Sequence, residues 1–219
     1  MKSVAVAVMA KVPGFGPLKT RLCPPLTPAL AASLYRCFLL DKVAQVVALR
    51  DAADPMVAFT PAEGRSTLTA LIPSGVRLIP QEGPDLGARL HHLLAGLLQE
   101  RYGGACAVDS DTPTLPAAYL REGCEILGEQ RADVVLGPTE DGGYYLVGLT
   151  TARRELFEGI PWSTPKVLPE TLRRARQLGL RVHQLPPWFD VDTGEDLRRL
   201  KAAERLPERT ARFLEMLSL

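Results

Sequence analysis

The segment Ala105-Cys106-Ala107-Val108-Asp109-Ser110-Asp111-Thr112-Pro113 joins a short apolar run to two carboxylates that stand one residue apart. Four apolar residues after a glycine pair are typical of a short buried strand, which places Asp109 and Asp111 at its carboxyl end. Ligands bind at that edge in open α/β sheets. Buried carboxylates raise each other's pKa unless a cation lies between or beside them. The segment therefore predicts an α/β sheet with a site for a hard divalent ion, Mg²⁺ or Mn²⁺.

A purely structural interpretation of these two carboxylates stays open. Both would then be loop residues, and one of them would cap the helix that is expected to begin near Leu115, because aspartate is a favoured N-cap.

Short apolar runs alternate with amphipathic segments along the chain. Strands are predicted over residues 4–9, 56–59, 76–79, 105–108, 134–137, 144–149 and 181–185. Helices are predicted over residues 28–46, 62–71, 86–98, 116–127 and 166–178, with further helices near the C-terminus. This alternation indicates a mostly parallel, mixed sheet with helices on both faces. With 219 residues, we expect one Rossmann-like three-layer α/β/α domain over residues 1–219.

The composition of the chain excludes several classes of binding partner and site. Lys and Arg number 26 against 25 Asp and Glu, so charge gives no reason to expect nucleic acid or an anionic membrane. The four cysteines show no C-x-x-C spacing, which argues against zinc and disulfides and fits a cytoplasmic protein. The apolar run over residues 4–10 is far shorter than the roughly 20 residues of a membrane helix. A homodimer is compatible with these features.

The loop after the first strand is rich in glycine and cations. It reads Gly14-Phe15-Gly16-Pro17-Leu18-Lys19-Thr20-Arg21, with Lys11 just upstream. Glycines let backbone N–H groups approach a phosphate, and the cations supply charge to hold it. It is not a P-loop, because Leu18 stands where that motif needs glycine, and Lys19 replaces the third glycine of the dinucleotide fingerprint. The alternative is a solvated loop with two surface cations.

Asp141-Gly142-Gly143 separates two predicted strands. The glycines permit close approach to a ligand, but taken alone they are typical of a hairpin turn. Tyr144 and Tyr145, which follow, are expected to pack in the core.

Asp190-Val191-Asp192 repeats the spacing of the first carboxylate pair. Thr193 and Asp196 form a capping box for a following helix, so capping accounts for them. It does not account for Asp190 and Asp192, for which a second metal-binding arm is the more economical interpretation.

Four motifs occur in a fixed order. They are Lys11…Gly14-x-Gly16…Lys19-Thr20-Arg21-Leu22, Asp109-Ser110-Asp111-Thr112-Pro113, Leu136-Gly137-Pro138-Thr139-Glu140-Asp141-Gly142-Gly143-Tyr144-Tyr145-Leu146, and Asp190-Val191-Asp192-Thr193-x-Glu195-Asp196-Leu197. In this combination the chain resembles the DUF2064 group of bacterial glycosyltransferase-like proteins. That group belongs to the nucleotide-diphospho-sugar transferase superfamily of GT-A fold, with the molybdenum-cofactor and phospholactate guanylyltransferases. The resemblance runs from Val4 to about Leu200, and the third motif is its most specific part.

The resemblance implies roles for individual residues. It implies nucleotide and phosphate binding by Lys11, Gly14, Gly16, Lys19, Thr20, Arg21, Gly142 and Gly143. It implies metal binding by Asp111 first and by Asp190 and Asp192 as a second arm. Catalytic roles fall to Lys19, Arg21, Asp111 and Asp141. Asp109 departs from the family pattern, which has glycine there, and is either an extra ligand or a neighbour.

The implied activity is a metal-dependent transferase acting on a nucleoside triphosphate or a sugar nucleotide and a small-molecule acceptor. In nucleotidyl transfer, Lys19, Arg21 and the ion would stabilise charge on the phosphates. In glycosyl transfer, Asp141 or Glu140 would orient or deprotonate an acceptor hydroxyl.

Two other classes are weighed against it. Asp109-x-Asp111 resembles the start of a haloacid-dehalogenase phosphatase motif, but Pro113 stands where that motif has threonine or valine. A non-catalytic nucleotide-binding or regulatory protein is the stronger alternative, because a sequence does not show turnover.

Overall fold

One seven-stranded sheet forms the centre of the molecule. The structure, a computed structural model, describes residues 3–100 and 102–217. The strands are β1 (Val4–Lys11), β2 (Ala53–Thr60), β3 (Arg77–Pro80), β4 (Gly104–Val108), β5 (Val134–Pro138), β6 (Tyr144–Leu149) and β7 (Val182–Gln184). Their order is β3-β2-β1-β4-β6-β5-β7, and among these strands of the described residues only β6 runs antiparallel to its neighbours. The mostly parallel, mixed sheet expected from the sequence is confirmed.

Helices connect the strands much as the hydrophobic pattern predicts. They are α1 (Pro28–Val47), α2 (Arg65–Leu71), α3 (Leu86–Gln99), α4 (Ala117–Gly128), α5 (Val167–Gln177), α6 (Gly194–Lys201) and α7 (Glu208–Met216), with 3-10 turns at Thr20–Leu22, Ala62–Gly64 and Arg154–Leu156. Side-chain caps fix where α1 and α3 begin. The Thr27 side chain accepts a hydrogen bond from Leu30 N at 3.3 Å, and the Asp85 side chain accepts one from Ala88 N at 2.8 Å. Both caps give backbone N–H groups of a first turn a partner.

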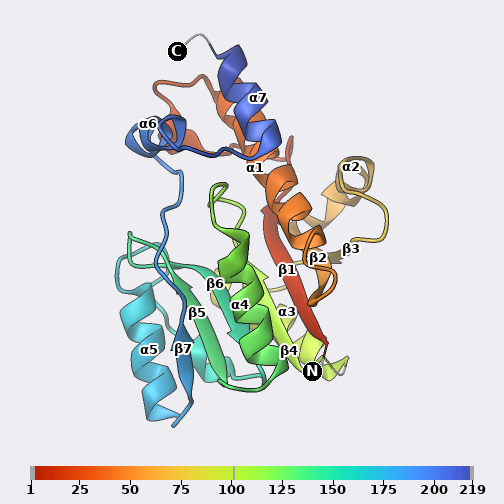
Figure 1. Cartoon of the computed structure of the whole chain (residues 1–219), viewed down its shortest axis with the longest axis vertical. Helices are drawn as coiled ribbons and strands as arrows, with labels where there is room; N and C mark the ends of the chain where they lie inside the picture. Colours follow the sequence, from red (N-terminus) through yellow and green to blue (C-terminus); the bar gives the residue numbers. More distant parts are fainter. Residues whose placement is uncertain (1–2, 101, 218–219) are drawn as a thin grey trace.

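Helices cover both faces of the sheet (Figure 1). Val4, Val6 and Val8 of β1 pack with residues of α1, α2 and α4, whereas Ala5 and Ala7 pack on the side of α3 and α5. Successive side chains of a strand point to opposite faces of the sheet. Because helices cover both faces here, apolar residues suit both sides of β1. This is the three-layer architecture that was predicted.

The C-terminal segment returns to the beginning of the chain. A third apolar cluster joins Leu22 and Phe38 to Val191, Leu197 and Leu214. Figure 1 shows α6 and α7 beside the start of α1, beyond the carboxyl ends of β1 and β4. Segments from the two ends of the sequence therefore meet at the edge of the sheet where a ligand is expected.

Within residues 3–100 and 102–217, no helix has both the length and the apolar character needed to cross a membrane.

Candidate active site

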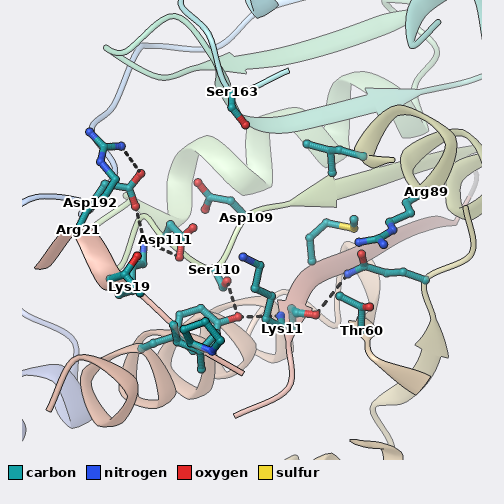
Figure 2. Close-up of a pocket in the computed structure, with 18 residues that line it drawn as sticks. Lys11, Lys19, Arg21, Thr60, Arg89, Asp109, Ser110, Asp111, Ser163 and Asp192 are labelled. Atoms are coloured by element: carbon teal, nitrogen blue, oxygen red, sulfur yellow. Dashed lines mark hydrogen bonds and ion pairs between the residues drawn. The ribbon is translucent and has the colours of Figure 1, made fainter. Parts of the chain in front are cut away.

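A pocket of about 550 Å³ lies at the carboxyl ends of the parallel strands (Figure 2). Its walls come from the ends of β1 and β2, the loop after β1, the segment after β3, and the loop after β4. It is lined by Met9, Ala10, Lys11, Pro17, Leu18, Lys19, Thr20, Arg21, Tyr35, Thr60, Gln81, Leu86, Arg89, Asp109, Ser110, Asp111, Ser163 and Asp192. The carboxyl edge of the sheet thus carries the cavity, as the rule for open α/β sheets predicts.

The predicted site residues divide into two groups. Those that line the pocket are Lys11, Lys19, Thr20, Arg21, Asp109, Asp111 and Asp192. Those outside its lining are Gly14, Gly16, Asp141, Gly142, Gly143 and Asp190.

An ammonium group lies between two carboxylates at one end of the pocket. Lys19 Nζ is 2.8 Å from Asp111 Oδ1 and 2.6 Å from Asp192 Oδ1, and Arg21 Nη1 is 3.4 Å from Asp192 Oδ2. The Lys19 side chain is only 6% exposed. Burial alone would lower the pKa of Lys19, but the charges of Asp111 and Asp192 outweigh burial and raise it. Lys19 is therefore a permanent cation.

Backbone contacts bring the two carboxylates together. Val191 N donates to Asp111 O at 2.9 Å, which ties the loop after β4 to the segment before α6. Thr193 and Asp196 form the predicted capping box, and Asp196 also accepts from Asp192 N at 3.1 Å. The capping box therefore also fixes the backbone of Asp192, whose side chain lines the pocket.

Asp109 is a half-buried carboxylate in the wall of the pocket. Its Oδ1 accepts from Thr112 Oγ1 at 2.6 Å, and Lys42 Nζ of α1 donates to Thr112 O at 2.9 Å and to Thr112 Oγ1 at 3.1 Å. Burial raises the pKa of Asp109, and the positive charge of Lys42 opposes this rise. Burial likewise lowers the pKa of Lys42. The idea that Asp109 or Asp111 caps the next helix is wrong, because the N-cap of α4 is Pro116.

Tyr35 of α1 connects the two loops under the pocket. Its hydroxyl accepts from Lys11 N at 2.9 Å and from Ser110 Oγ at 3.2 Å. Burial, followed by the charge of Asp111, raises the pKa of Tyr35 to about 12. The neutral phenol thus fixes the end of β1 against the loop after β4.

Asp141 and Asp190 lie near each other beside the pocket. Asp141 Oδ1 accepts from Thr139 Oγ1 at 2.6 Å and from Gly143 N at 3.0 Å, so its carboxylate is held by its own turn. Burial and the nearby charges of Asp141 and Asp192 raise the pKa of Asp190 to about 6. A cluster of negative charge therefore extends from the pocket to the β5–β6 turn.

The Gly142-Gly143 pair makes the hairpin turn between β5 and β6. Gly142 has φ +92°, and a Cβ there would lie 2.4 Å from Pro165 O. Its own carbonyl accepts from Leu168 N at 2.9 Å, so the turn is packed against the start of α5. Close packing of the backbone accounts for glycine at this position.

The glycines of the first loop stand in open space. Gly14 and Gly16 have φ +90° and +141°, and no atom lies within 4 Å of a Cβ built on either. Gly16 lines a neighbouring pocket of about 320 Å³ together with Lys11 and Phe15.

The sequence analysis did not single out three residues of the pocket wall, Tyr35, Gln81 and Arg89, or Lys42, which lies behind that wall and binds Thr112. Tyr35 and Lys42 belong to α1, where the apolar spacing indicates only a helix face that packs in the core. Gln81 donates from Nε2 to Ala58 O at 2.8 Å, and Arg89 donates from Nε to Gly83 O at 3.0 Å. A lysine at a buried position of α1 is the one signal that could have been read, because buried charges need a partner.

The sequence matches the family model "Uncharacterized protein conserved in bacteria (DUF2064)" over residues 43–164. No curated protein matches it.

Solved structures share the fold over nearly the whole chain. The "putative nucleotide-diphospho-sugar transferase" of Desulfovibrio desulfuricans G20 is 29% identical, with TM-score 0.89 over 99% of this chain and 95% of that one. CMP:2-keto-3-deoxy-manno-octonic acid synthetase complexed with CTP is 12% identical, with TM-score 0.59 over 98% and 100%. Glucosyl-3-phosphoglycerate synthase from Mycobacterium tuberculosis, complexed with Mn²⁺ and UDP, is 13% identical, with TM-score 0.55 over 99% and 78%. The last two show likeness of fold alone.

Proposed function

We propose that this chain, which belongs to the DUF2064 family, is a metal-dependent transferase that acts on a nucleoside triphosphate or a sugar nucleotide. The acceptor is a small molecule bound in the same cleft. Proteins of similar fold include a cytidylyltransferase and glucosyl-3-phosphoglycerate synthase. This likeness supports a transferase that uses a nucleotide.

The observation that carries this proposal is the meeting of Lys19, Asp111 and Asp192 in a pocket of about 550 Å³. The three residues come from three separate loops, and the pocket has the volume of a small-molecule site. Arg21 and Lys11 line the same space and add positive charge suited to phosphate oxygens. Figure 2 shows Lys11 between the carboxylates and Arg89.

The carboxylates suit a hard divalent ion by their chemistry. The side chains of Asp111 and Asp192 are 37% and 33% exposed, although Asp111 Oδ1, the oxygen beside Lys19, is buried. Ions in solution can therefore reach these carboxylates from their exposed side. Within the described residues no group of three acidic, histidine or cysteine side chains is placed to hold a metal, and Lys19 lies between these two carboxylates. Asp111 and Asp192, with Asp190 beside them, would hold the ion, which supplies positive charge to a diphosphate.

The chain's own residues then bind and orient the substrates. Lys19 and Arg21 would donate hydrogen bonds to phosphate oxygens, where negative charge grows as the bond to the leaving phosphate breaks. Asp141 is the carboxylate proposed to orient an acceptor hydroxyl. Glu140 is less suited to accept a proton, because Arg199 binds it through two contacts of 2.6 and 2.9 Å and lowers its pKa.

The test is a thermal-shift screen of the four nucleoside triphosphates and common sugar nucleotides, each with Mg²⁺, with Mn²⁺ and with EDTA. A ligand at 100 times its Kd should stabilise the protein by about 2.7 kcal/mol. Asp111→Asn should lose the part of this stabilisation that depends on the ion. Asp51→Asn, on the surface and paired with Arg121, is the matched control and should respond as the natural protein does.

The pattern of hits separates the reactions. Stabilisation by triphosphates alone, followed by pyrophosphate release with a phosphorylated co-substrate, selects nucleotidyl transfer. Stabilisation by a sugar nucleotide alone selects glycosyl transfer. Binding without turnover of any nucleotide selects a regulatory protein, and stabilisation by no ligand contradicts the proposal.

A further inference from the structure

The position of Lys19 bears on how an ion enters the site. A single ammonium nitrogen contacts a carboxylate oxygen of Asp111 and one of Asp192, at 2.8 and 2.6 Å. These are the distances of charge-assisted hydrogen bonds. The two carboxylates thus already share one cation, and it belongs to the protein.

A divalent ion that binds between the two carboxylates competes with the ammonium group for the same position. Mg²⁺ demands oxygen ligands at about 2.0 to 2.1 Å in near-octahedral geometry, so an ion bound to Asp111 Oδ1 and Asp192 Oδ1 would take the place that Lys19 Nζ now occupies. Like charges a few ångströms apart also repel strongly in a partly buried site. Each cation therefore opposes binding of the other.

We propose that Lys19 is a built-in competitor of the divalent ion, and that the ion binds Asp111 and Asp192 only when the Lys19 side chain moves away. This inference rests on the proposed function in taking these carboxylates as the ion site. The long side chain of Lys19 can reorient, and the phosphates of a nucleotide would offer its ammonium group a new anionic partner. Ion and nucleotide would therefore enter together, and the ion alone would bind weakly.

The accessible surface of the three side chains fits this competition. Lys19 is 6% exposed and is enclosed by its partners, whereas Asp111 and Asp192 keep 37% and 33% of their side-chain surface in solvent. An incoming ion can thus reach the carboxylates, but their shared contact point is filled. Arg21 remains 69% exposed and contacts only the outer oxygen of Asp192, so it leaves that point free.

The experiment is a titration with Mn²⁺ alone, without nucleotide, in which electron paramagnetic resonance measures free Mn²⁺. Lys19→Met and Lys19→Gln remove the ammonium charge, and each should bind Mn²⁺ at least tenfold more tightly than the natural protein. Lys19→Arg keeps the charge and should show no such gain. Circular dichroism checks that each variant is folded, and Lys19→Gln, which keeps hydrogen-bond donors, decides the matter where Lys19→Met does not fold.

Two further variants identify the cause of a gain. Arg89→Met removes one charge from the opposite side of the same pocket and should change the Kd for Mn²⁺ by less than about threefold (Figure 2). Lys19→Gln combined with Asp111→Asn should lose the gain, because the ion then lacks one of its carboxylates.

Unchanged or weaker binding of Mn²⁺ by Lys19→Gln would overturn the inference. An equal gain in Arg89→Met would overturn it too, since the effect would then be one of general charge. The titration contains no nucleotide, so its failure leaves nucleotide transfer standing. Failure of the nucleotide screen, in turn, leaves the competition between Lys19 and Mn²⁺ intact.

Discussion

Two lysines contact the loop over residues 109–112 from opposite sides. Lys19 binds Asp111 from the pocket, and Lys42 binds Thr112 from helix α1 below it. Taking an ion out of water costs several kcal/mol, so each buried charge has to be compensated by nearby groups of opposite sign or by hydrogen bonds. The geometry of the candidate site is therefore set by charges inside the protein, whereas Arg21 is 69% exposed and makes only a long contact of 3.4 Å with Asp192.

Arg21→Ala should weaken nucleotide binding by about 1 to 3 kcal/mol, the range for hydrogen bonds to charged groups. The melting temperature should stay the same, because the side chain is 69% exposed and its contact with Asp192 is long, at 3.4 Å. Calorimetric titration with the nucleotide found by screening measures the loss. An unchanged Kd would show that Arg21 is only a surface cation of a solvated loop.

Lys42→Met should destabilise the fold by about 3 kcal/mol, because it removes the buried cation that most offsets the desolvation of Asp109 and leaves Thr112 O without its donor. Urea unfolding measures the change. Lys166→Met, at an exposed lysine, is the control and should lie within about 0.5 kcal/mol of the natural protein. A loss of less than about 1 kcal/mol in Lys42→Met would mean that methionine packing compensates for the buried charge.

At the scale of helices and strands, local patterns predicted most of the architecture. Thr27-Pro28, Asp85 and the capping box at Thr193 mark helix starts because capping is decided within a few residues. The carboxyl-end rule also predicted where Asp111 would lie. What the sequence could not predict depends on contacts between distant segments: the pairing of β6 between β4 and β5, and the hydrogen bond from Val191 to Asp111.

The sequence also could not predict how the environments of the two aspartates in the loop after β4 differ. Asp109 and Asp111 look alike in the chain and both line the pocket, yet Asp109 interacts with Thr112 and the charge of Lys42, whereas Asp111 pairs with Lys19. Burial and partner charges decide such differences, and both arise only when α1 packs beneath the loop.

The β5–β6 turn gives a prediction for an element. Gly142→Ala should cost about 2 to 4 kcal/mol, since its positive φ disfavours alanine and the new Cβ would meet Pro165. Gly96→Ala, within α3 and with open space around its Cβ, should instead stabilise by about 0.5 to 1 kcal/mol. Chemical denaturation compares the two. If Gly142→Ala were neutral, the turn would be loose enough to move, and its glycines would be better explained by ligand approach.

At the scale of the whole molecule, the candidate site is formed where an N-terminal and a C-terminal segment of the chain meet. Lys19 and Asp192 are 173 residues apart, and α7 packs on α1. Asp41 of α1 fastens this junction: its carboxylate accepts from Thr210 N and Thr210 Oγ1, both at 2.8 Å, and from Arg209 N at 3.2 Å. An aspartate at a helix N-terminus satisfies unpaired N–H groups and interacts favourably with the helix dipole.

Asp41→Ala should therefore act on the site from a distance. It leaves the first N–H groups of α7 without their acceptor in a buried place, at a cost of about 3 kcal/mol, and loosens the C-terminal segment that carries Asp192. Hydrogen exchange should speed up over residues 192–216 more than in β1 and β4, and nucleotide affinity should fall although Asp41 does not line the pocket. Asp51→Ala, which removes an exposed partner of Arg121, should change neither quantity. Faster exchange spread evenly over the sheet, with nucleotide affinity retained, would mean that Asp41 supports the fold as a whole and has no particular hold on the site.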